Sequence, residues 1–204
     1  AAGKVAGLDA RVVRVSFSGE TSFEINVPAR YANSFLGVLI EAGSPHGIAP
    51  YGIEALMVLR LEKGYLHVGS DTDGSSTPDD VGWGHVARSK SGDYIGKRSL
   101  DREGNQDRSR KQLVGLEPLE PQQAMRPGGH LLIGPDREPP AETDGWVTSA
   151  CYSPTLDKHI ALGVLRSGRE REGEILTVCD EDHRFNVKVV PPVFYDPDNE
   201  RLGD

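Results

Sequence analysis

The feature that most constrains the fold is a set of six short apolar segments in the second half of the chain, separated by glycine and proline. Segments of this length, bounded by turn residues, are typical of strands. Several short strands at close spacing indicate a small antiparallel barrel or sandwich. The predicted strands are residues 112–116, 130–133, 146–151, 160–165, 175–178 and 185–190.

An alternating pattern near the start of the chain predicts a β-hairpin over residues 12–27, with a turn at residues 18–20. In its second strand, Phe23 and the apolar residues that follow take one face, so Glu24 and Asn26 point together to the other. If that face lines a cavity, Glu24 becomes a fixed acceptor for the N–H groups of a ligand. The alternative is a solvated carboxylate on an outer face.

Two helices are predicted after the hairpin. Residues 29–43 have helical spacing and a possible stop at Gly43, and residues 51–63 form a helix that is apolar on more than one side. The second helix is therefore expected to be central. Its polar residues are expected to form buried pairs, ligand contacts or the more common surface salt bridges; they are Glu54, Arg60 and Glu62.

Shorter segments carry weaker signals. Residues 77–80, Thr-Pro-Asp-Asp, have the chemistry of a helix start, and a further short helix is expected over residues 95–100. Residues 101–111 are charged and contain no apolar side chain, which predicts a domain boundary. The basic run at 108–111 is interpreted as a solvated linker.

Composition excludes several classes of function. The formal net charge of -8, without a lysine and arginine stripe, argues against nucleic-acid binding, and no apolar run is long enough for a membrane span. Cys151 and Cys179 lack metal-ligand spacing and are expected to be reduced, buried residues of a cytoplasmic protein. The Asp-x-Asp-Gly loop at 71–74 lacks the later ligands of a calcium site, so no metal is expected.

No self-contained catalytic set is visible, but seven blocks taken together resemble the glycine cleavage T-protein (aminomethyltransferase) family. They keep the order of the family over nearly the whole chain. Within that family, the amino-acid sequence of residues 52–64 most resembles that of the alpha subunit of heterotetrameric sarcosine oxidase. The blocks are residues 17–25, 59–65, 77–80, 92–100, 145–149, 153–163 and 193–197.

The resemblance implies an α+β fold. Residues 1–110 would be the second half of a T-protein-like folate-binding domain, and residues 111–204 would be its C-terminal antiparallel β-barrel. The first half of the folate domain, with the aspartate beside the reactive folate nitrogen, would precede Ala1 in a longer polypeptide. The partners expected are that N-terminal part and the other sarcosine oxidase subunits, and the piece alone is expected to be inactive.

The resemblance also implies a role for two residues. Glu24 matches the family glutamate that binds the 2-amino and N3 hydrogens of the pterin, and Tyr65 matches an aromatic position near the folate. Leu56 stands where T-proteins carry a folate-contacting arginine, a departure that favours an oxidase-type relative.

The activity implied is oxidative demethylation of sarcosine, with transfer of the one-carbon unit to tetrahydrofolate. Flavin and NAD would be bound elsewhere in the full complex, because no dinucleotide fingerprint occurs in this chain. The alternatives are a true aminomethyltransferase of glycine cleavage and a folate-binding or scaffold relative without turnover.

Overall fold

The computed structural model describes residues 1–181 and 183–203. The chain forms two compact units, one made of residues 1–60 together with the C-terminal residues from 198 onward, and one made of residues 61–197. Helices and strands both contribute, so the predicted α+β class is confirmed. The two units are described separately below.

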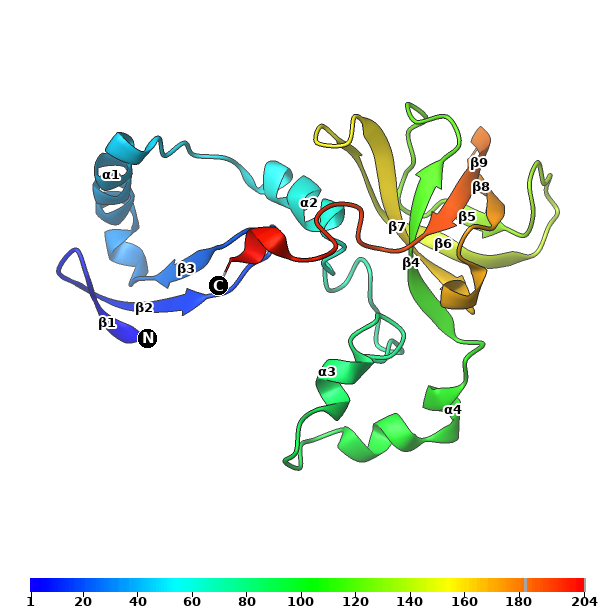
Figure 1. Ribbon diagram of the computed structural model, residues 1–204, viewed down its shortest axis with the longest axis horizontal. Coiled ribbons are helices and arrows are strands. Elements are labelled where there is room, and N and C mark those ends of the chain that lie inside the picture. The colour runs from blue at the N-terminus through cyan, green and yellow to red at the C-terminus, as the bar shows by residue number, and fades with distance from the viewer. Residues whose placement is uncertain (182, 204) are drawn as a thin grey trace. The chain divides into compact units, whose positions relative to one another are not determined.

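The first unit contains the predicted hairpin inside a three-stranded antiparallel sheet of order β1-β2-β3 (Figure 1). Strands β2 (Leu8–Arg14) and β3 (Phe23–Asn26) form the hairpin, and β1 (Ala2–Val5) pairs with the other edge of β2. The pairing was predicted, but the first strand begins four residues earlier than residue 12 and ends sooner. The sequence pattern did not reveal β1.

The C-terminal segment contacts the hairpin loop. The Thr21 hydroxyl donates a hydrogen bond of 2.6 Å to the backbone oxygen of Leu202, and the Arg14 guanidinium donates to the same oxygen at 3.0 Å. The hairpin loop is therefore bonded to a segment that lies far away in sequence. Backbone pairing continues one step past the strands, with a hydrogen bond of 3.3 Å from the Val15 amide to the Ser22 oxygen.

The helix predicted for residues 29–43 is present as α1 (Ala32–Gly43), preceded by a 3₁₀ turn at Ala29–Tyr31. Gly43 is not a left-handed stop, because its φ of -82° is helical and a 3₁₀ turn continues to Gly47. A side chain at Gly43 would lie 2.7 Å from Ile48, so this glycine permits a close approach. The left-handed residue that ends the turn is Gly47, whose φ is 75°.

The second predicted helix is α2 (Ile53–Glu62), and its last residues belong to the second unit. Glu54 is exposed, whereas Arg60 and Glu62 are buried. Leu61, which is 2% exposed, packs in an apolar cluster with Ile160 and Leu162 of the barrel. Complete burial of one leucine side chain contributes about 2 kcal/mol, so this contact fixes the end of α2 to the barrel.

All six predicted strands are present, and they close into an antiparallel barrel of order β4-β7-β6-β5-β8-β9 (Figure 1). Closure gives every strand two paired edges. The strands are β4 (Lys111–Pro118), β5 (His130–Leu132), β6 (Thr143–Ser153), β7 (Lys158–Arg166), β8 (Ile175–Asp180) and β9 (His183–Val190).

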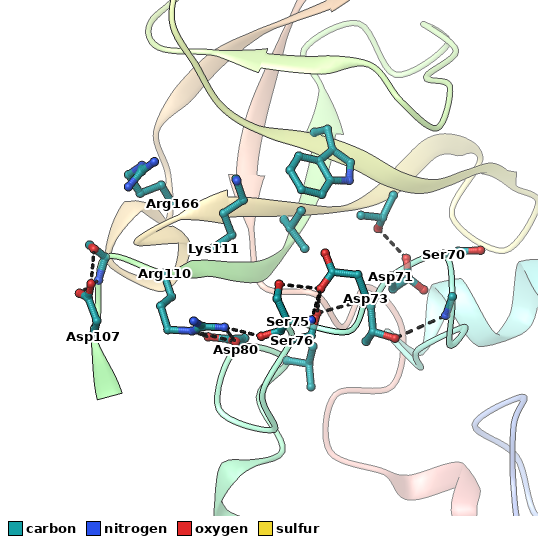
Figure 2. Close-up of a pocket in the computed structure, with 17 residues that line it drawn as sticks. Ser70, Asp71, Asp73, Ser75, Ser76, Asp80, Asp107, Arg110, Lys111 and Arg166 are labelled. Carbon is teal, nitrogen blue, oxygen red and sulfur yellow. Dashed lines mark hydrogen bonds and ion pairs between the residues drawn. The ribbon is translucent and has the colours of Figure 1, made fainter. Parts of the chain in front are cut away.

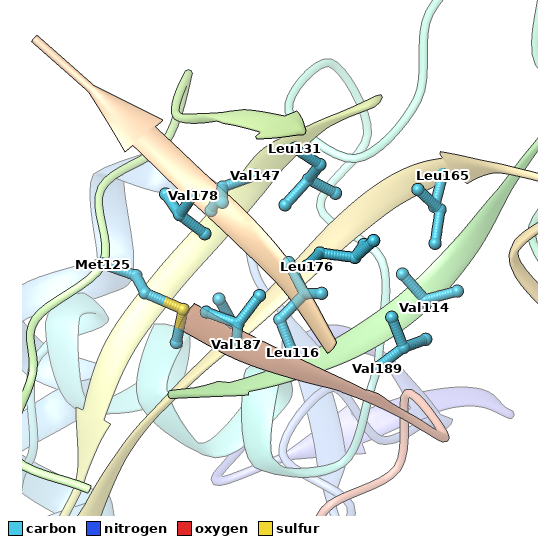
Figure 3. Close-up of a cluster of buried hydrophobic side chains, with 11 residues drawn as sticks. Val114, Leu116, Met125, Leu131, Val147, Leu165, Leu176, Val178, Val187 and Val189 are labelled. Atoms are coloured by element: carbon cyan, nitrogen blue, oxygen red, sulfur yellow. The ribbon is translucent and has the colours of Figure 1, made fainter. Parts of the chain in front are cut away.

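Alternation along the strands separates two apolar clusters. On β7, Ala161 and Leu165 face the barrel core, which Figure 3 shows filled by valine and leucine side chains together with Met125. Ile160 and Leu162, of opposite parity, join the other cluster with Leu61. Because both faces of β7 are covered, apolar residues occupy consecutive positions along it instead of alternating with polar ones.

Three short helical segments lie between α2 and β4 in the second unit. They are α3 (Gly84–Arg88), a 3₁₀ helix at Lys97–Asp101 that corresponds to the short helix predicted near residue 95, and α4 (Glu103–Gln106). The helix start predicted at residues 77–80 is wrong, since these residues form a turn. The Thr77 amide still donates a hydrogen bond of 2.8 Å to the Asp80 carboxylate, and the Asp80 amide donates one of 3.3 Å to the Thr77 hydroxyl. Gly82, whose φ is 83°, has a left-handed backbone that does not continue as a helix.

Gly64 generates a stability prediction. Its φ is 71°, and a Cβ at this position would lie 2.3 Å from the backbone oxygen of Pro192. Gly64→Ala is therefore expected to lower the free energy of unfolding in urea by about 2–4 kcal/mol. Gly74→Ala is the matched control, since no atom lies within 4 Å of a Cβ there, and equal losses in the two variants would contradict the account.

Candidate functional site

Glu24 lies on the open face of the first unit's sheet. It stands opposite Val13 of β2, and Asn26 stands opposite Arg11, so these four residues share one face. All four are exposed, whereas Ile25 on the other face is partly buried. The structure describes no hydrogen bond or ion pair for the Glu24 carboxylate within residues 1–181 and 183–203. The arrangement presents a carboxylate on a stiff strand beside an exposed valine.

Tyr65 belongs to the second unit and follows the left-handed Gly64. Its side chain is half-buried. The close contact between Gly64 and Pro192 fixes the backbone from which Tyr65 projects. Neither the Glu24 role nor the Tyr65 role is decided by this geometry, so both remain predictions.

The charged residues at the end of α2 form buried contacts within the second unit. The Glu62 carboxylate, in a residue only 2% exposed, accepts a hydrogen bond of 2.5 Å from the Ser153 hydroxyl and one of 3.2 Å from Thr155. Lys63 is 4% exposed and forms an ion pair of 2.8 Å with the Asp196 carboxylate. Glu62 is therefore a buried, paired residue, which is one of the outcomes expected for this helix. Lys63, just after the helix, forms a second buried pair with Asp196.

The second unit contains an open cavity of about 530 Å³ between the loop at residues 69–76, residues 107–111 and the barrel strands β6 and β7 (Figure 2). Polar side chains dominate its lining. Those labelled in Figure 2 are Ser70, Asp71, Asp73, Ser75, Ser76, Asp80, Asp107, Arg110, Lys111 and Arg166.

Asp71 forms the floor of this cavity and is 1% exposed. Its Oδ1 accepts hydrogen bonds from the hydroxyls of Thr148 and Ser149, at 2.5 and 2.7 Å, and its Oδ2 accepts one from the His67 amide at 2.8 Å. The Asp-x-Asp-Gly loop is thus fixed to the barrel by a buried carboxylate. Removal of one partner would leave that charge without compensation.

Arg110 and Asp80 form the adjoining wall. Three hydrogen bonds of 2.7–3.1 Å run from the guanidinium to the carboxylate, and a fourth of 2.6 Å reaches the backbone oxygen of Ser75. The pKa of the Arg110 guanidinium is raised, chiefly by its hydrogen bonds to Asp80. The solvated-linker interpretation of residues 108–111 is therefore wrong for Arg110, and Lys111 is the first residue of β4.

No signal in the sequence pointed to this cavity, because its lining comes from segments up to about a hundred residues apart. Within the described residues, Cys151 and Cys179 form no disulfide, and both are partly rather than fully buried, whereas full burial was expected. Within the described residues, no group of three or more histidine, cysteine, aspartate or glutamate residues is arranged to hold a metal ion. In the same part of the chain, none of the helices has the length and apolarity that crossing a bilayer demands.

The fold and the sequence together define the class. Residues 1–91 match the model of the GCVT N-terminal domain, and residues 111–196 match that of the glycine cleavage T-protein C-terminal barrel domain. The chain belongs to the glycine cleavage T-protein (aminomethyltransferase) superfamily. The predicted boundary between residues 110 and 111 stays a prediction.

Individual relatives include two kinds of enzyme. The chain is 44% identical over 191 residues to the sarcosine oxidase subunit alpha of Rhizobium meliloti, which covers 93% of this chain and 19% of the relative. It is 39% identical over 197 residues to that of Corynebacterium sp. strain U-96, covering 96% and 20%. An aminomethyltransferase from Desulfitobacterium hafniense is 30% identical over 193 residues, covering 95% and 51%.

A solved structure shows the same fold. The crystal structure of glycine cleavage system aminomethyltransferase T from Bartonella henselae superposes with a TM-score of 0.74 at 23% identity, over 91% of this chain and 50% of that one. The chain therefore spans about a fifth of its sarcosine oxidase relatives and about half of its aminomethyltransferase relatives.

Two adjacent carboxylates supply a matched prediction about the cavity wall. Asp80 is 6% exposed and holds Arg110, whereas Asp79 pairs at the surface with Arg88. Asp80→Asn is expected to cost about 2–3 kcal/mol of stability, because it removes the charge that compensates Arg110. Asp79→Asn is expected to cost less than about 1 kcal/mol. Urea unfolding measures both, and a larger loss for Asp79→Asn would refute the wall's structural role.

Proposed function

We propose that this chain is the folate-binding portion of a sarcosine oxidase alpha-like protein. The observation that carries the proposal is the Glu24 carboxylate, which lies on an exposed strand face without a described partner. Family membership supports a folate ligand, and the resemblance implies that Glu24 would occupy the family's pterin-binding position. The activity proposed is oxidative demethylation of sarcosine with transfer of the one-carbon unit to tetrahydrofolate.

The chemistry of Glu24 suits a pterin edge. A carboxylate accepts two parallel N–H bonds, and the pterin offers its 2-amino group and N3–H on one edge. The pairing of β3 with β2 holds the Glu24 backbone in place, and exposed Val13 beside it offers an apolar contact for the flat ring. Glu24 and Val13 therefore have the chemistry needed to hold a pterin.

Tetrahydrofolate, when bound, would supply the nitrogen that accepts the one-carbon unit. The proposed role of this chain is to hold the pterin in one orientation, so that the folate nitrogen is already positioned when it captures the one-carbon unit. Tyr65 is proposed as a second folate contact on the strength of its motif position alone. No catalytic acid or base is assigned to this chain.

The assignment to an oxidase rests on degree of similarity. Identity is 39–44% to the sarcosine oxidase alpha subunits, against 30% to the aminomethyltransferase from Desulfitobacterium. Because the chain spans only about a fifth of those alpha subunits, flavin and NAD binding are proposed to lie elsewhere in the complex. The complete enzyme is expected to consume sarcosine, whereas an aminomethyltransferase would require a lipoyl-protein substrate.

An N-terminal part of the same polypeptide is the proposed partner of the first unit. Within the described residues, only Ala10 and Phe35 of this unit are buried apolar side chains, while many large apolar side chains are exposed. An uncovered apolar surface of this kind favours a docked partner. The exposed set includes Val13, Val15, Phe23, Leu36, Val38 and Leu39.

Folate affinity tests the role of Glu24. In the longer polypeptide, Glu24→Gln is expected to weaken tetrahydrofolate binding at least about tenfold, because the amide cannot accept both N–H bonds as an anion does. Isothermal titration calorimetry measures the effect. Glu41→Gln, on exposed α1, is the control and should leave the affinity unchanged. Unchanged affinity in Glu24→Gln would eliminate the assigned contact.

The 204-residue chain by itself should bind tetrahydrofolate weakly or not at all, since the proposed site is completed by the N-terminal part. The same calorimetric titration on the isolated chain measures this. Sub-micromolar affinity of the chain alone would show that the proposed N-terminal part is not needed for the site.

A further inference from the structure

The lining of the second unit's cavity includes two side chains of opposite charge that form no ion pair within the described residues. They are Lys111 and Asp73. The other charged groups of the lining are engaged. Asp80 pairs with Arg110 and Arg166 with Asp144 at 3.6 Å, and both carboxylate oxygens of Asp71 and of Asp107 accept hydrogen bonds. This cavity lies entirely in residues 61–197, so it is independent of the role proposed for Glu24.

Asp73 is held as an anion with one oxygen available. Its Oδ1 accepts hydrogen bonds from the Ser75 amide at 2.8 Å, the Ser75 hydroxyl at 2.7 Å and the Ser76 hydroxyl at 3.2 Å. These bonds, led by the one from the Ser75 hydroxyl, lower the pKa of the Asp73 carboxyl. The structure describes no hydrogen bond to its Oδ2, which remains an acceptor on the cavity side (Figure 2).

Lys111 supplies the complementary charge. Its Nζ lies 4.8 Å from the centroid of the Trp146 ring, a cation–π contact that places the ammonium beside an aromatic wall of the cavity. In Figure 2 the side chains of Lys111 and Asp73 extend toward the same space from β4 and from the loop at residues 69–76. One unpaired cation, one unpaired anion and one indole face therefore line a single cavity.

We propose that this cavity binds a small zwitterion of the α-amino acid class. The ligand carboxylate would accept a hydrogen bond from Lys111 Nζ, and its ammonium group would donate to Asp73 Oδ2. Its apolar side chain would lie against Trp146. Lys111 Nζ and Asp73 Oδ2 carry opposite charges, so a ligand that carries both signs is matched at both atoms, whereas a simple anion or amine leaves one of them unmatched.

The walls are fixed by the contacts already described. Asp71 attaches the loop to β6 through Thr148 and Ser149, and Arg110 attaches residues 107–111 to Asp80. A preformed cavity loses less conformational entropy when a ligand binds than a flexible one does. A volume of about 530 Å³ accommodates a free amino acid with a side chain.

Tryptophan fluorescence provides the test, because the chain has two tryptophans, Trp83 and Trp146. In a Trp83→Phe background, Trp146 is the only indole and reports on the cavity directly. Titration with glycine, L-alanine and L-leucine is expected to give a saturable change. Acetate and methylammonium, which each carry one charge, are expected to bind at least about tenfold more weakly.

Matched variants locate the site. Lys111→Gln and Asp73→Asn should each weaken amino acid binding at least about tenfold. Lys90→Gln removes an exposed lysine that also lies over an aromatic ring, 5.8 Å from Tyr94, and Asp93→Asn removes an exposed carboxylate outside the cavity. Both controls should bind as the parent does, with circular dichroism confirming the fold of every variant.

Three results would overturn the proposal. One is a folded parent chain that shows no saturable change with any of the three amino acids. Another is acetate binding as tightly as glycine, which would indicate a simple anion site. The third is full binding retained in both Lys111→Gln and Asp73→Asn. None of these outcomes bears on folate binding at Glu24, so the two proposals fail separately.

Discussion

The buried, charged end of α2 is the contact on which the second unit depends. Leu61 packs against the outer face of the barrel, and the Glu62 carboxylate accepts a hydrogen bond from Ser153. The backbone oxygen of Glu62 also accepts hydrogen bonds of 2.9 Å from the amides of Phe194 and Tyr195. The helix end thus joins two stretches of chain more than ninety residues away. Because unpaired buried charges are costly, only one register of these segments satisfies Glu62 and Lys63 together.

The same use of buried carboxylates explains why the candidate cavity is a stable feature. Asp71 and Asp80 are both nearly inaccessible, and each bonds a segment distant in sequence. These two carboxylates hold the walls together, and Asp73 and Lys111 are the groups proposed to contact a ligand. The first unit differs, because it has few buried apolar side chains and presents Glu24 on an exposed strand.

Sequence periodicity predicted what depends on neighbours along the chain. The six barrel strands followed from apolar runs between turns, and the β2–β3 pairing followed from the alternation around Glu24. It could not predict contacts between distant residues. Glu62 and Ser153 are 91 residues apart, so the burial of this carboxylate has no local signal. Arg110 was interpreted as part of a solvated linker for the same reason, since Asp80 is 30 residues away. For Glu24, periodicity predicted the face, and only the family resemblance suggested a ligand.

The central claim is that the open face of the β2–β3 pair holds the pterin of a folate. A structure of the longer polypeptide with tetrahydrofolate bound is the most direct measurement of it. The account predicts both Glu24 carboxylate oxygens within hydrogen-bond distance, about 2.7–2.9 Å, of the pterin 2-amino nitrogen and N3. A folate whose pterin lies on other residues, with Glu24 left in solvent, would contradict it.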